Sequence, residues 1–211
     1  TVAPGRTWTN QYDTSVWRLT SVDEGPGALI SYTYDERGRV KTRGVRNQAS
    51  QAFTTDLADR GTQVSPNGAS YRYDGHGRRT MVTKGSTTTV QVYTQAGQLV
   101  YQSSPTSDGI FRNGFQQGDQ NYSAQTGNKR YVYLGRHLIA EDGTAGRVYI
   151  HTDALGSPVR RTTTGGVPTT TERENYEPYG WGPLAQSTPG YTGHVADAET
   201  GLSYMQARYY D

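Results

Sequence analysis

Hydrophobic and polar residues alternate with period two along much of the chain. In residues 70–79, SYRYDGHGRR, one polar residue separates Tyr71 from Tyr73. Side chains of an extended strand point alternately to its two faces, so both rings are expected on the same face. Other windows rich in Val, Tyr, Thr and Ile alternate in the same way, and helical spacing is scarce. The pattern predicts an all-β chain.

A turn signal follows the tyrosine pair. Asp74 stands where the first residue of a type I turn belongs, and its carboxylate can accept hydrogen bonds from backbone amides. Gly77 falls three residues later, where a residue with positive φ closes the turn as a bulge, and Arg78 begins the return strand. Residues 70–79 are therefore expected to form one antiparallel β-hairpin.

The same phrase recurs at intervals close to multiples of roughly twenty residues, which is typical of a repetitive architecture. Residues 31–40 read SYTYDERGRV, and weaker copies occur in VQVYTQAGQL, where Thr94 replaces the aspartate, and in VYIHTDALGS and YEPYG. Two further stretches, DLADRGTQV and KRYVYLGRHL, are candidates for the missing copies. The residues assigned to this structural repeat motif are Tyr32, Tyr34, Asp35, Gly38, Arg39, Tyr71, Tyr73, Asp74, Gly77, Arg78, Tyr93, Gly97, Asp153, Gly156, Tyr176 and Gly180.

Composition shows where the apolar area of such hairpins comes from. Only 32% of the 211 residues are hydrophobic, but 17 are Tyr, against 3 Phe and 3 Trp. A tyrosine buries its ring and keeps its hydroxyl near water. Together with a mean hydropathy of −0.82, this favours a thin sheet wetted on both faces over a thick aliphatic core.

Charge and cysteine content exclude several function classes. The net charge is +2, and 21 basic and 19 acidic residues are interspersed, so nothing indicates a nucleic-acid partner. The absence of cysteine excludes disulfides and thiolate metal sites. The apolar runs are too short to span a bilayer, and the first residues show no signal-peptide pattern.

No catalytic, cofactor-binding or metal-ligating residue is predicted. Asp35, Asp74, Asp153 and Glu177 could be read as paired glycosidase carboxylates, but each stands in a turn position that prefers Asp for conformational reasons. The four histidines lack metal-site spacing. Ser157 lacks the surroundings of a nucleophile elbow, and a turn explains it better.

Exposed aromatic side chains are the candidates for outward contacts. Tyr and Trp stack on sugars and anchor partner proteins. The possible surface contacts are Trp181 and Tyr179, in the YEPYGWG stretch, and among the other tryptophans Trp8 and Trp17.

The last ten residues, LSYMQARYYD, read as one strand. Alternation then places Tyr204 and Tyr210 on one face and Tyr209 on the other. Aromatic groups on both faces predict a strand that is covered on both sides.

The Tyr-x-Tyr-Asp-x-x-Gly-Arg phrase resembles the YD repeat of bacterial RHS (rearrangement hot spot) proteins, of teneurins and of the C component of insecticidal Tc toxins. Three later stretches, VYIHTDALGSPVRRTTTGG, YEPYGWG and YTGHVADAETGLSYMQARYYD, resemble in that order the end of an RHS core. The resemblance implies a curved antiparallel strip that winds spirally into a hollow shell around a C-terminal toxin or other cargo. It assigns residues 28–160 to YD repeats and 161–211 to the core-associated segment, and covers residues 1–27 weakly.

The resemblance also sets expectations for activity and partners. Family members often end in a self-cleaving segment that contains Asp-Pro, and this chain has no Asp-Pro pair, so a non-enzymatic role is expected. A complete shell needs several hundred residues, so the expected partners are the remainder of a longer RHS chain or other copies of this one, with a possible toxin cargo. The implied localisation is secreted or at a bacterial cell surface. Two alternatives stay open, a self-assembling extracellular scaffold or fibre and a Tyr-rich surface that binds a glycan or a partner.

Overall fold

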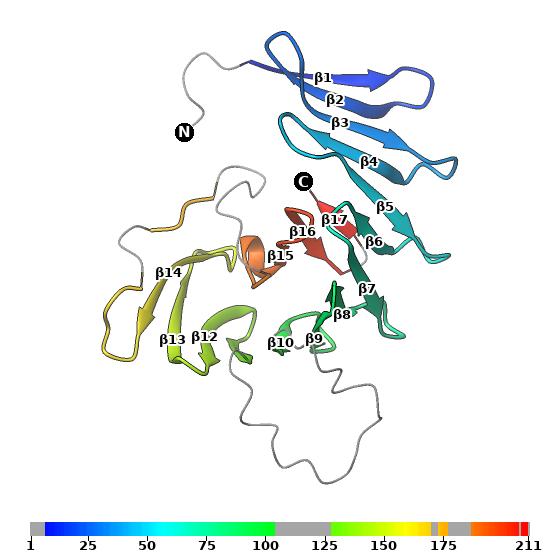
Figure 1. Cartoon of the computed structure of the whole chain (residues 1–211). Coiled ribbons are helices and arrows are strands. Elements are labelled where there is room, and N and C mark those ends of the chain that lie inside the picture. Colours follow the sequence, from blue (N-terminus) through cyan, green and yellow to red (C-terminus); the bar gives the residue numbers. More distant parts are fainter. Residues whose placement is uncertain (1–6, 104–127, 170–172, 177–186, 207, 211) are drawn as a thin grey trace. The chain divides into compact units, whose positions relative to one another are not determined.

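In the part of the chain that the structure describes, the secondary structure is almost entirely antiparallel β-strand, and the strands follow one another in sequence order (Figure 1). The computed structural model describes residues 7–103, 128–169, 173–176, 187–206 and 208–210. They form two compact units, Thr1–Gly68 and Ala69–Asp211. The predicted all-β fold of consecutive hairpins is confirmed. In the described part of the chain, no helix has the length and apolar character needed to cross a membrane.

The first unit is a meander in which each strand pairs with the next. Its strands are β1 (Trp8–Asp13), β2 (Arg18–Glu24), β3 (Ala28–Tyr34), β4 (Val40–Val45), β5 (Gln51–Thr55) and β6 (Gly61–Ser65).

The second unit continues the same pattern and adds a separate small sheet. Its meander contains β7 (Ala69–Tyr73), β8 (Arg79–Lys84), β9 (Thr87–Tyr93), β10 (Leu99–Gln102), β11 (Lys129–Leu134), β12 (His137–Gly143), β13 (Gly146–Thr152) and β14 (Pro158–Thr163). The small sheet contains β15 (Val195–Asp197), β16 (Leu202–Met205) and β17 (Arg208–Tyr210), and the 3-10 helix η3 (Tyr191–Gly193) precedes it. We call η3 and β15–β17 the C-terminal clip; within this unit it lies on the inner side of the curve formed by β7–β14 (Figure 1).

A bulge follows the turn of each hairpin that carries the Asp-x-x-Gly phrase. In the β7–β8 pair, Arg72 lies opposite Met81 but Tyr73 lies opposite Arg79, so the return strand contains one extra residue. Gly77 has a φ of +78° in this turn, a backbone conformation that glycine adopts without the penalty of a Cβ. Such bulges bend the strand and increase its local right-handed twist. Because each bulge follows its turn in the same way, their effects on curvature are expected to add within a unit.

One face of the second unit is dry, which corrects the expectation of a sheet wetted on both sides. Leu99, Leu138 and Tyr204 are each 1% exposed, in a cluster that joins the sheet to the clip. The composition is polar because the other face is solvated. Tyr149 is 42% exposed and its neighbour Ile150 only 6%, as alternation along β13 requires. A low aliphatic content therefore suffices, because the sheet buries only one of its two faces.

The prediction of one continuous strand at the C-terminus is wrong. Strands β16 and β17 form a tight hairpin in which Gln206 has a φ of +61°. The hairpin pairs Tyr204 with Tyr209, so the two rings share a face instead of lying on opposite faces. Simple alternation fails here because no glycine marks the turn.

We expect Gly77→Ala to destabilise the protein by about 1–2 kcal/mol, because a Cβ is disfavoured at positive φ and open space surrounds the position. Gly75→Ala is the matched control in the same turn: it also has open space but no positive φ, so it should change the free energy of unfolding by less than about 0.5 kcal/mol. Urea unfolding of both variants checks this. Equal losses would show that backbone conformation at Gly77 is not the constraint.

Candidate functional site

Of the acidic side chains singled out from the sequence, Asp35, Asp74 and Asp153 each organise their own turn, and Glu177 lies outside the described residues. Asp74 Oδ1 accepts hydrogen bonds from the backbone amides of His76 and Arg78, both at 2.9 Å, and Oδ2 accepts one from Arg78 Nε at 2.8 Å. Asp35 makes the equivalent contacts with Arg37 and Arg39. In the Asp35 and Asp74 turns every carboxylate oxygen has a donor within its own hairpin, so the arrangement serves conformation rather than acid–base chemistry.

Two weaker copies use the same geometry with other residues. Thr94 Oγ1 accepts from the backbone amide of Gln98 at 3.2 Å, and Asp153 Oδ1 accepts from the amides of Leu155 and Ser157. Gly97 and Gly156 have φ values of +84° and +88°.

The assigned repeat residues omit the turn centred on Asp56. Its carboxylate accepts from the backbone amides of Ala58 and Arg60 and from Arg60 Nε. Asp59, with a φ of +62°, takes the place of glycine. The sequence signal for this turn is the spacing of four residues between Asp56 and Arg60 in DLADR. Asp59 can replace glycine in it because Asp tolerates the left-handed conformation better than most residues.

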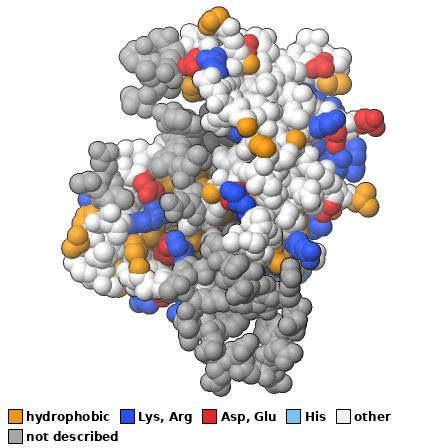
Figure 2. All heavy atoms as spheres, viewed as in Figure 1, with side chains coloured by type: hydrophobic (Ala, Val, Ile, Leu, Met, Phe, Trp, Pro, Cys, Tyr) orange, Lys and Arg blue, Asp and Glu red, His pale blue; other side chains and the backbone are white. Residues whose placement is uncertain are grey.

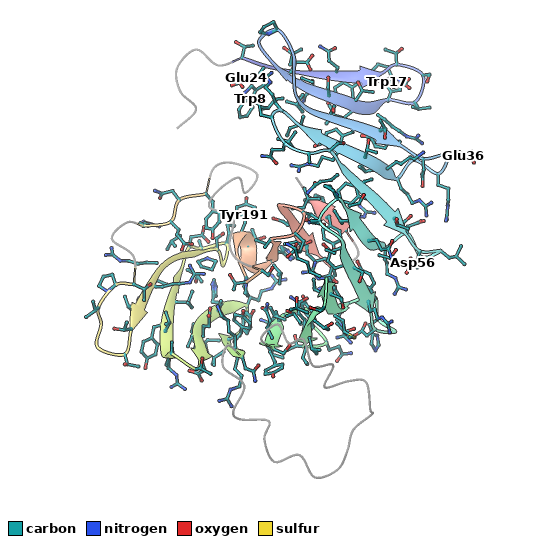
Figure 3. The ribbon with its side chains drawn as sticks, viewed as in Figure 1. Trp8, Trp17, Glu24, Glu36, Asp56 and Tyr191 are labelled. Atoms are coloured by element: carbon teal, nitrogen blue, oxygen red, sulfur yellow. The ribbon has the colours of Figure 1, made fainter. Side chains whose placement is uncertain are left out.

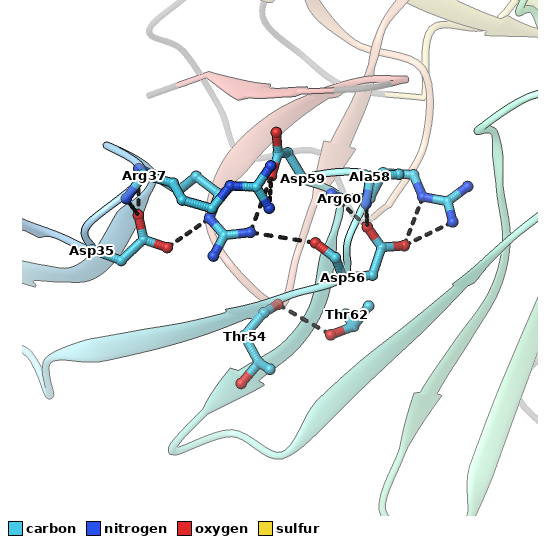
Figure 4. A network of polar contacts seen from close by, with 9 residues as sticks. Asp35, Arg37, Thr54, Asp56, Ala58, Asp59, Arg60 and Thr62 are labelled. Atoms are coloured by element: carbon cyan, nitrogen blue, oxygen red, sulfur yellow. Dashed lines mark hydrogen bonds and ion pairs between the residues drawn. The ribbon is translucent and has the colours of Figure 1, made fainter.

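The residue four positions after the turn aspartate links one hairpin to the next. Arg39 Nη1 donates to the carbonyl of Asp56 at 3.3 Å and pairs with Asp59 at 3.0 Å (Figure 4). In the second unit, Arg78 Nη1 donates to the carbonyl of Thr94 at 2.8 Å, and Gln98 Nε2 donates to that of Gly135 at 2.8 Å. Within each unit, successive turns are thus tied along one edge of the sheet.

These contacts favour the ionised form of the turn carboxylates. The backbone amide of Arg39 is the main group that lowers the pKa of Asp35. At Asp74, burial opposes ionisation, but the backbone and side-chain hydrogen bonds of Arg78 outweigh it and lower the pKa.

A buried ion pair joins the sheet to the C-terminal clip, and the sequence interpretation missed it. Arg79 on β8 is 0% exposed and Asp197 at the end of β15 is 1% exposed. Arg79 Nη1 lies 3.2 Å from Asp197 Oδ2, and Arg79 Nε donates to Gln91 Oε1 at 3.2 Å. The carboxylate also accepts from the hydroxyls of Tyr71 at 2.9 Å and Thr200 at 3.0 Å.

Tyrosine rings surround the guanidinium of Arg79. Its central carbon lies 5.0 Å from the ring centroid of Tyr71, 4.5 Å from that of Tyr204 and 5.9 Å from that of Tyr209. The hydroxyl of Tyr204 accepts a hydrogen bond from the Arg79 backbone amide at 2.6 Å, and that of Tyr209 accepts one from Nη1 at 3.1 Å. A desolvated cation between aromatic faces gains from the ring quadrupoles, so the rings replace part of the lost hydration.

Burial keeps these tyrosines neutral. It is the largest cause that raises the pKa of Tyr71, Tyr93 and Tyr204 above 10.0. Tyr176, whose ring lies 5.7 Å from that of Tyr191, has its pKa raised by burial to about 12. In the clip, burial lowers the pKa of His194. In each case burial favours the neutral form of the side chain.

Comparison of the repeat copies supplies the signal for Arg79. Five positions after the first residue of each turn, three other copies have Val40, Leu99 and Pro158, and the copies that begin at Asp56 and Glu177 have glycine. Leu99 and Pro158 are buried on the inner face, so a charged residue at this position is an exception within the repeat. Its partner Asp197 could not be identified from the sequence, because it lies more than a hundred residues away.

Ser157 has a structural contact with the clip. It is 0% exposed, and its Oγ accepts a hydrogen bond from the backbone amide of Thr192 at 3.0 Å. Among the described residues, Ser157 Oγ has no hydrogen bond to a histidine or a carboxylate; Asp153 binds the backbone amide of Ser157 instead. The clip therefore has a buried polar contact with the sheet at Ser157 as well as at Arg79.

The predicted tyrosine positions in the first unit are only partly buried. Tyr32 and Tyr34 lie on β3, and the Tyr34 hydroxyl donates to the carbonyl of Leu19 at 2.6 Å. The guanidinium of Arg18 approaches the space above Gly38 so closely that a Cβ there would overlap with it.

Trp8 and Trp17 are exposed by 52% and 77% (Figure 3). Tyr179, Gly180 and Trp181 lie outside the described residues. On the face drawn in Figure 2, acidic and basic side chains are interspersed and apolar side chains form small separate patches.

No protein-family model matches the chain, and no curated protein matches it. Among solved structures, it is similar to a chain of the Photorhabdus luminescens Tc holotoxin pore, at 12% identity and a TM-score of 0.35 over 98% of this chain and 15% of that one. It is also similar to TcdB2-TccC3, at 15% identity and a TM-score of 0.34 over 97% of this chain and 17% of that one. The chain thus spans about one-sixth of the length of these structures, which are Tc toxin chains.

We expect Asp197→Asn to lower the free energy of unfolding by about 3–5 kcal/mol, since it leaves the Arg79 charge buried without a counter-charge. Lys84→Gln is the matched control: Lys84 pairs with Glu199 between the same two segments at 2.7 Å, but its side chain is 52% exposed. Its loss should cost less than about 1 kcal/mol. Urea unfolding compares them, and similar losses would contradict the role given to the buried pair.

We also expect stability to fall in acid. The turn carboxylates have folded pKa values below the ordinary 3.8. Their contribution is therefore complete above pH 3.8 and is lost as the pH falls through the folded values. Unfolding curves between pH 7 and pH 2 measure the loss, which should be smaller in Asp74→Asn because that side chain does not titrate. An unchanged acid slope in that variant would count against the assignment.

Proposed function

We propose that the chain is a wall segment of an RHS-type shell, a non-enzymatic structural protein that encloses or displays cargo such as a C-terminal toxin. The motif series supports membership of this class, and the all-β meander is the fold that it requires. The domain boundaries follow the same proposal, with residues 28–160 as YD repeats, 161–211 as the core-associated segment and 1–27 as a further repeat. The β1–β2 hairpin supports the last assignment, because Asp13 accepts from the Ser15 amide at 2.8 Å, in the manner of the other turns.

The contact that carries the proposal is the anchoring of the clip on the inner face of the second unit. Asp197, Tyr204 and Tyr209 bind the face formed by β7–β10 through a dry, hydrogen-bonded cluster. Polypeptide that continues from β17 would therefore start at this face. A wall that binds its own C-terminal segment on its inner face would direct any following cargo to that face.

The turn links supply mechanical continuity. Arg39, Arg78 and Gln98 each bond to the following turn, so within each unit neighbouring hairpins are joined at the sheet edge as well as by strand pairing. A wall built in this way resists separation of adjacent hairpins without needing a thick core.

We further propose that the protein is secreted or displayed at a bacterial cell surface, and that its partner is the rest of a longer RHS chain or other copies of itself. A surface role has one observation in its favour: Trp8, Tyr12 and Trp17 are exposed on β1 and its turn. These aromatic groups suit a glycan or a partner protein.

The test is the intact mass of the protein as its native cells make it, with the C-terminal peptide sequenced, followed by limited proteolysis. We expect polypeptide beyond Asp211 that resists protease while the wall is folded and becomes sensitive in Asp197→Asn. A protein that ends at Asp211, or a following segment cut equally fast in both forms, would overturn enclosure of cargo. Assembly or surface binding would then be the function to pursue.

A further inference from the structure

The Arg79–Asp197 pair stands where the repeat elsewhere places an apolar residue. In the second unit the equivalent positions hold Leu99 and Pro158, both buried on the inner face. Removing two charges from water is costly, and replacing a buried ion pair by well-packed apolar residues is often neutral or stabilising. The pair therefore needs an explanation other than stability.

The face that receives the clip is built from similar hairpins. Tyr71, Gln91 and Ile150 each lie three positions before the first residue of a turn, and all three are buried on this face. Strand β11, in a hairpin with a shorter turn, adds the buried ring of Tyr131. Apolar burial is non-directional and roughly proportional to area, so it distinguishes poorly between neighbouring hairpins. A clip with Val195, Leu202 and Tyr204 on its buried side could find apolar cover at more than one place along such a face.

The other polar contacts between the clip and the sheet discriminate weakly. The hydroxyls of Tyr73 and Tyr209 lie 3.4 Å apart, and Tyr93 is the equivalent tyrosine one hairpin further on. Lys84 and Glu199 pair at a site where the lysine is half exposed, and exposed pairs contribute little. Ser157 bonds to the backbone amide of Thr192, a group that every residue except proline provides. Among the described residues of this unit, Arg79 is the buried cation of the face and Asp197 is the buried anion of the clip.

We infer that Arg79 and Asp197 are specificity residues: they select the β7–β8 hairpin as the docking place of the clip and fix its register. In any other docking, Asp197 would be buried without a cation and Arg79 without an anion, and each mismatch is strongly unfavourable. A single buried polar group fixes register in the same way in coiled coils. This role concerns the folding of the chain and holds whether or not the protein encloses cargo.

The chain has no cysteine, so an engineered cysteine pair reports the register directly. One reporter combines Lys84→Cys with Glu199→Cys and records the native docking. The other combines Gln102→Cys with Glu199→Cys and records docking one hairpin further on, because Gln102 ends β10 and pairs with buried Gln91, which places it on the face that receives the clip. A short bismaleimide links the thiols, and mass spectrometry measures the yield of each linked peptide.

In the parent we expect the native pair to be linked in excess over the shifted pair. In Arg79→Met with Asp197→Leu, the ratio of native to shifted product should fall about tenfold, equivalent to about 1.4 kcal/mol of lost preference. The urea midpoint of this double variant should exceed that of Asp197→Asn. Arg78→Met is the matched control, since it removes a neighbouring arginine and leaves the buried pair intact, and its ratio should equal that of the parent.

Two outcomes would overturn the inference. A double variant that keeps the parent ratio would show that apolar packing alone selects the docking place. A double variant no more stable than Asp197→Asn would show that the pair is retained for its net contribution to stability.

Discussion

Coverage of one tyrosine-rich sheet face is the constraint on which the second unit depends. Each hairpin is too thin to bury its own rings, and a meander of hairpins only extends that face. The C-terminal clip resolves this by placing Val195, Tyr204 and Tyr209 on the face. Tyrosine suits the arrangement because its ring supplies area while its hydroxyl reaches a partner, as Tyr71 does with Asp197. The core is therefore polar at its centre and still dry.

A different kind of contact stabilises the edge of the meander along which the Asp turns lie in each unit. There the turn carboxylates bind backbone amides of their own hairpin, and the following arginine reaches the next turn. These contacts are partly exposed, so each contributes little alone, but the carboxylate turn recurs at Asp35, Asp56 and Asp74, and the arginine link at Arg39 and Arg78. Local contacts thus specify the shape of each repeat, and the buried face of the second unit specifies where the clip packs.

The sequence predicted what short-range chemistry determines. The turns at Asp35 and Asp74 follow from residue type and spacing over five positions, because Asp, Gly and strand alternation each have a direct conformational effect. The turn at Asp56 was harder to recognise, since Asp59 replaces glycine at positive φ. The hairpin at Gln206 was missed for the same reason. Turn prediction failed where a residue other than glycine accepts the left-handed conformation.

The clip could not be predicted in the same way, because it joins residues such as Arg79 and Tyr204 that are far apart in sequence. No local pattern encodes that contact. The repeat nevertheless contains an indirect signal. When its copies are aligned, Arg79 is the charged residue at a position where other copies have Val40, Leu99 and Pro158. A departure of this kind must be explained by something outside the repeat. In a repetitive fold, the residues that break the pattern identify where the repeat meets the rest of the protein.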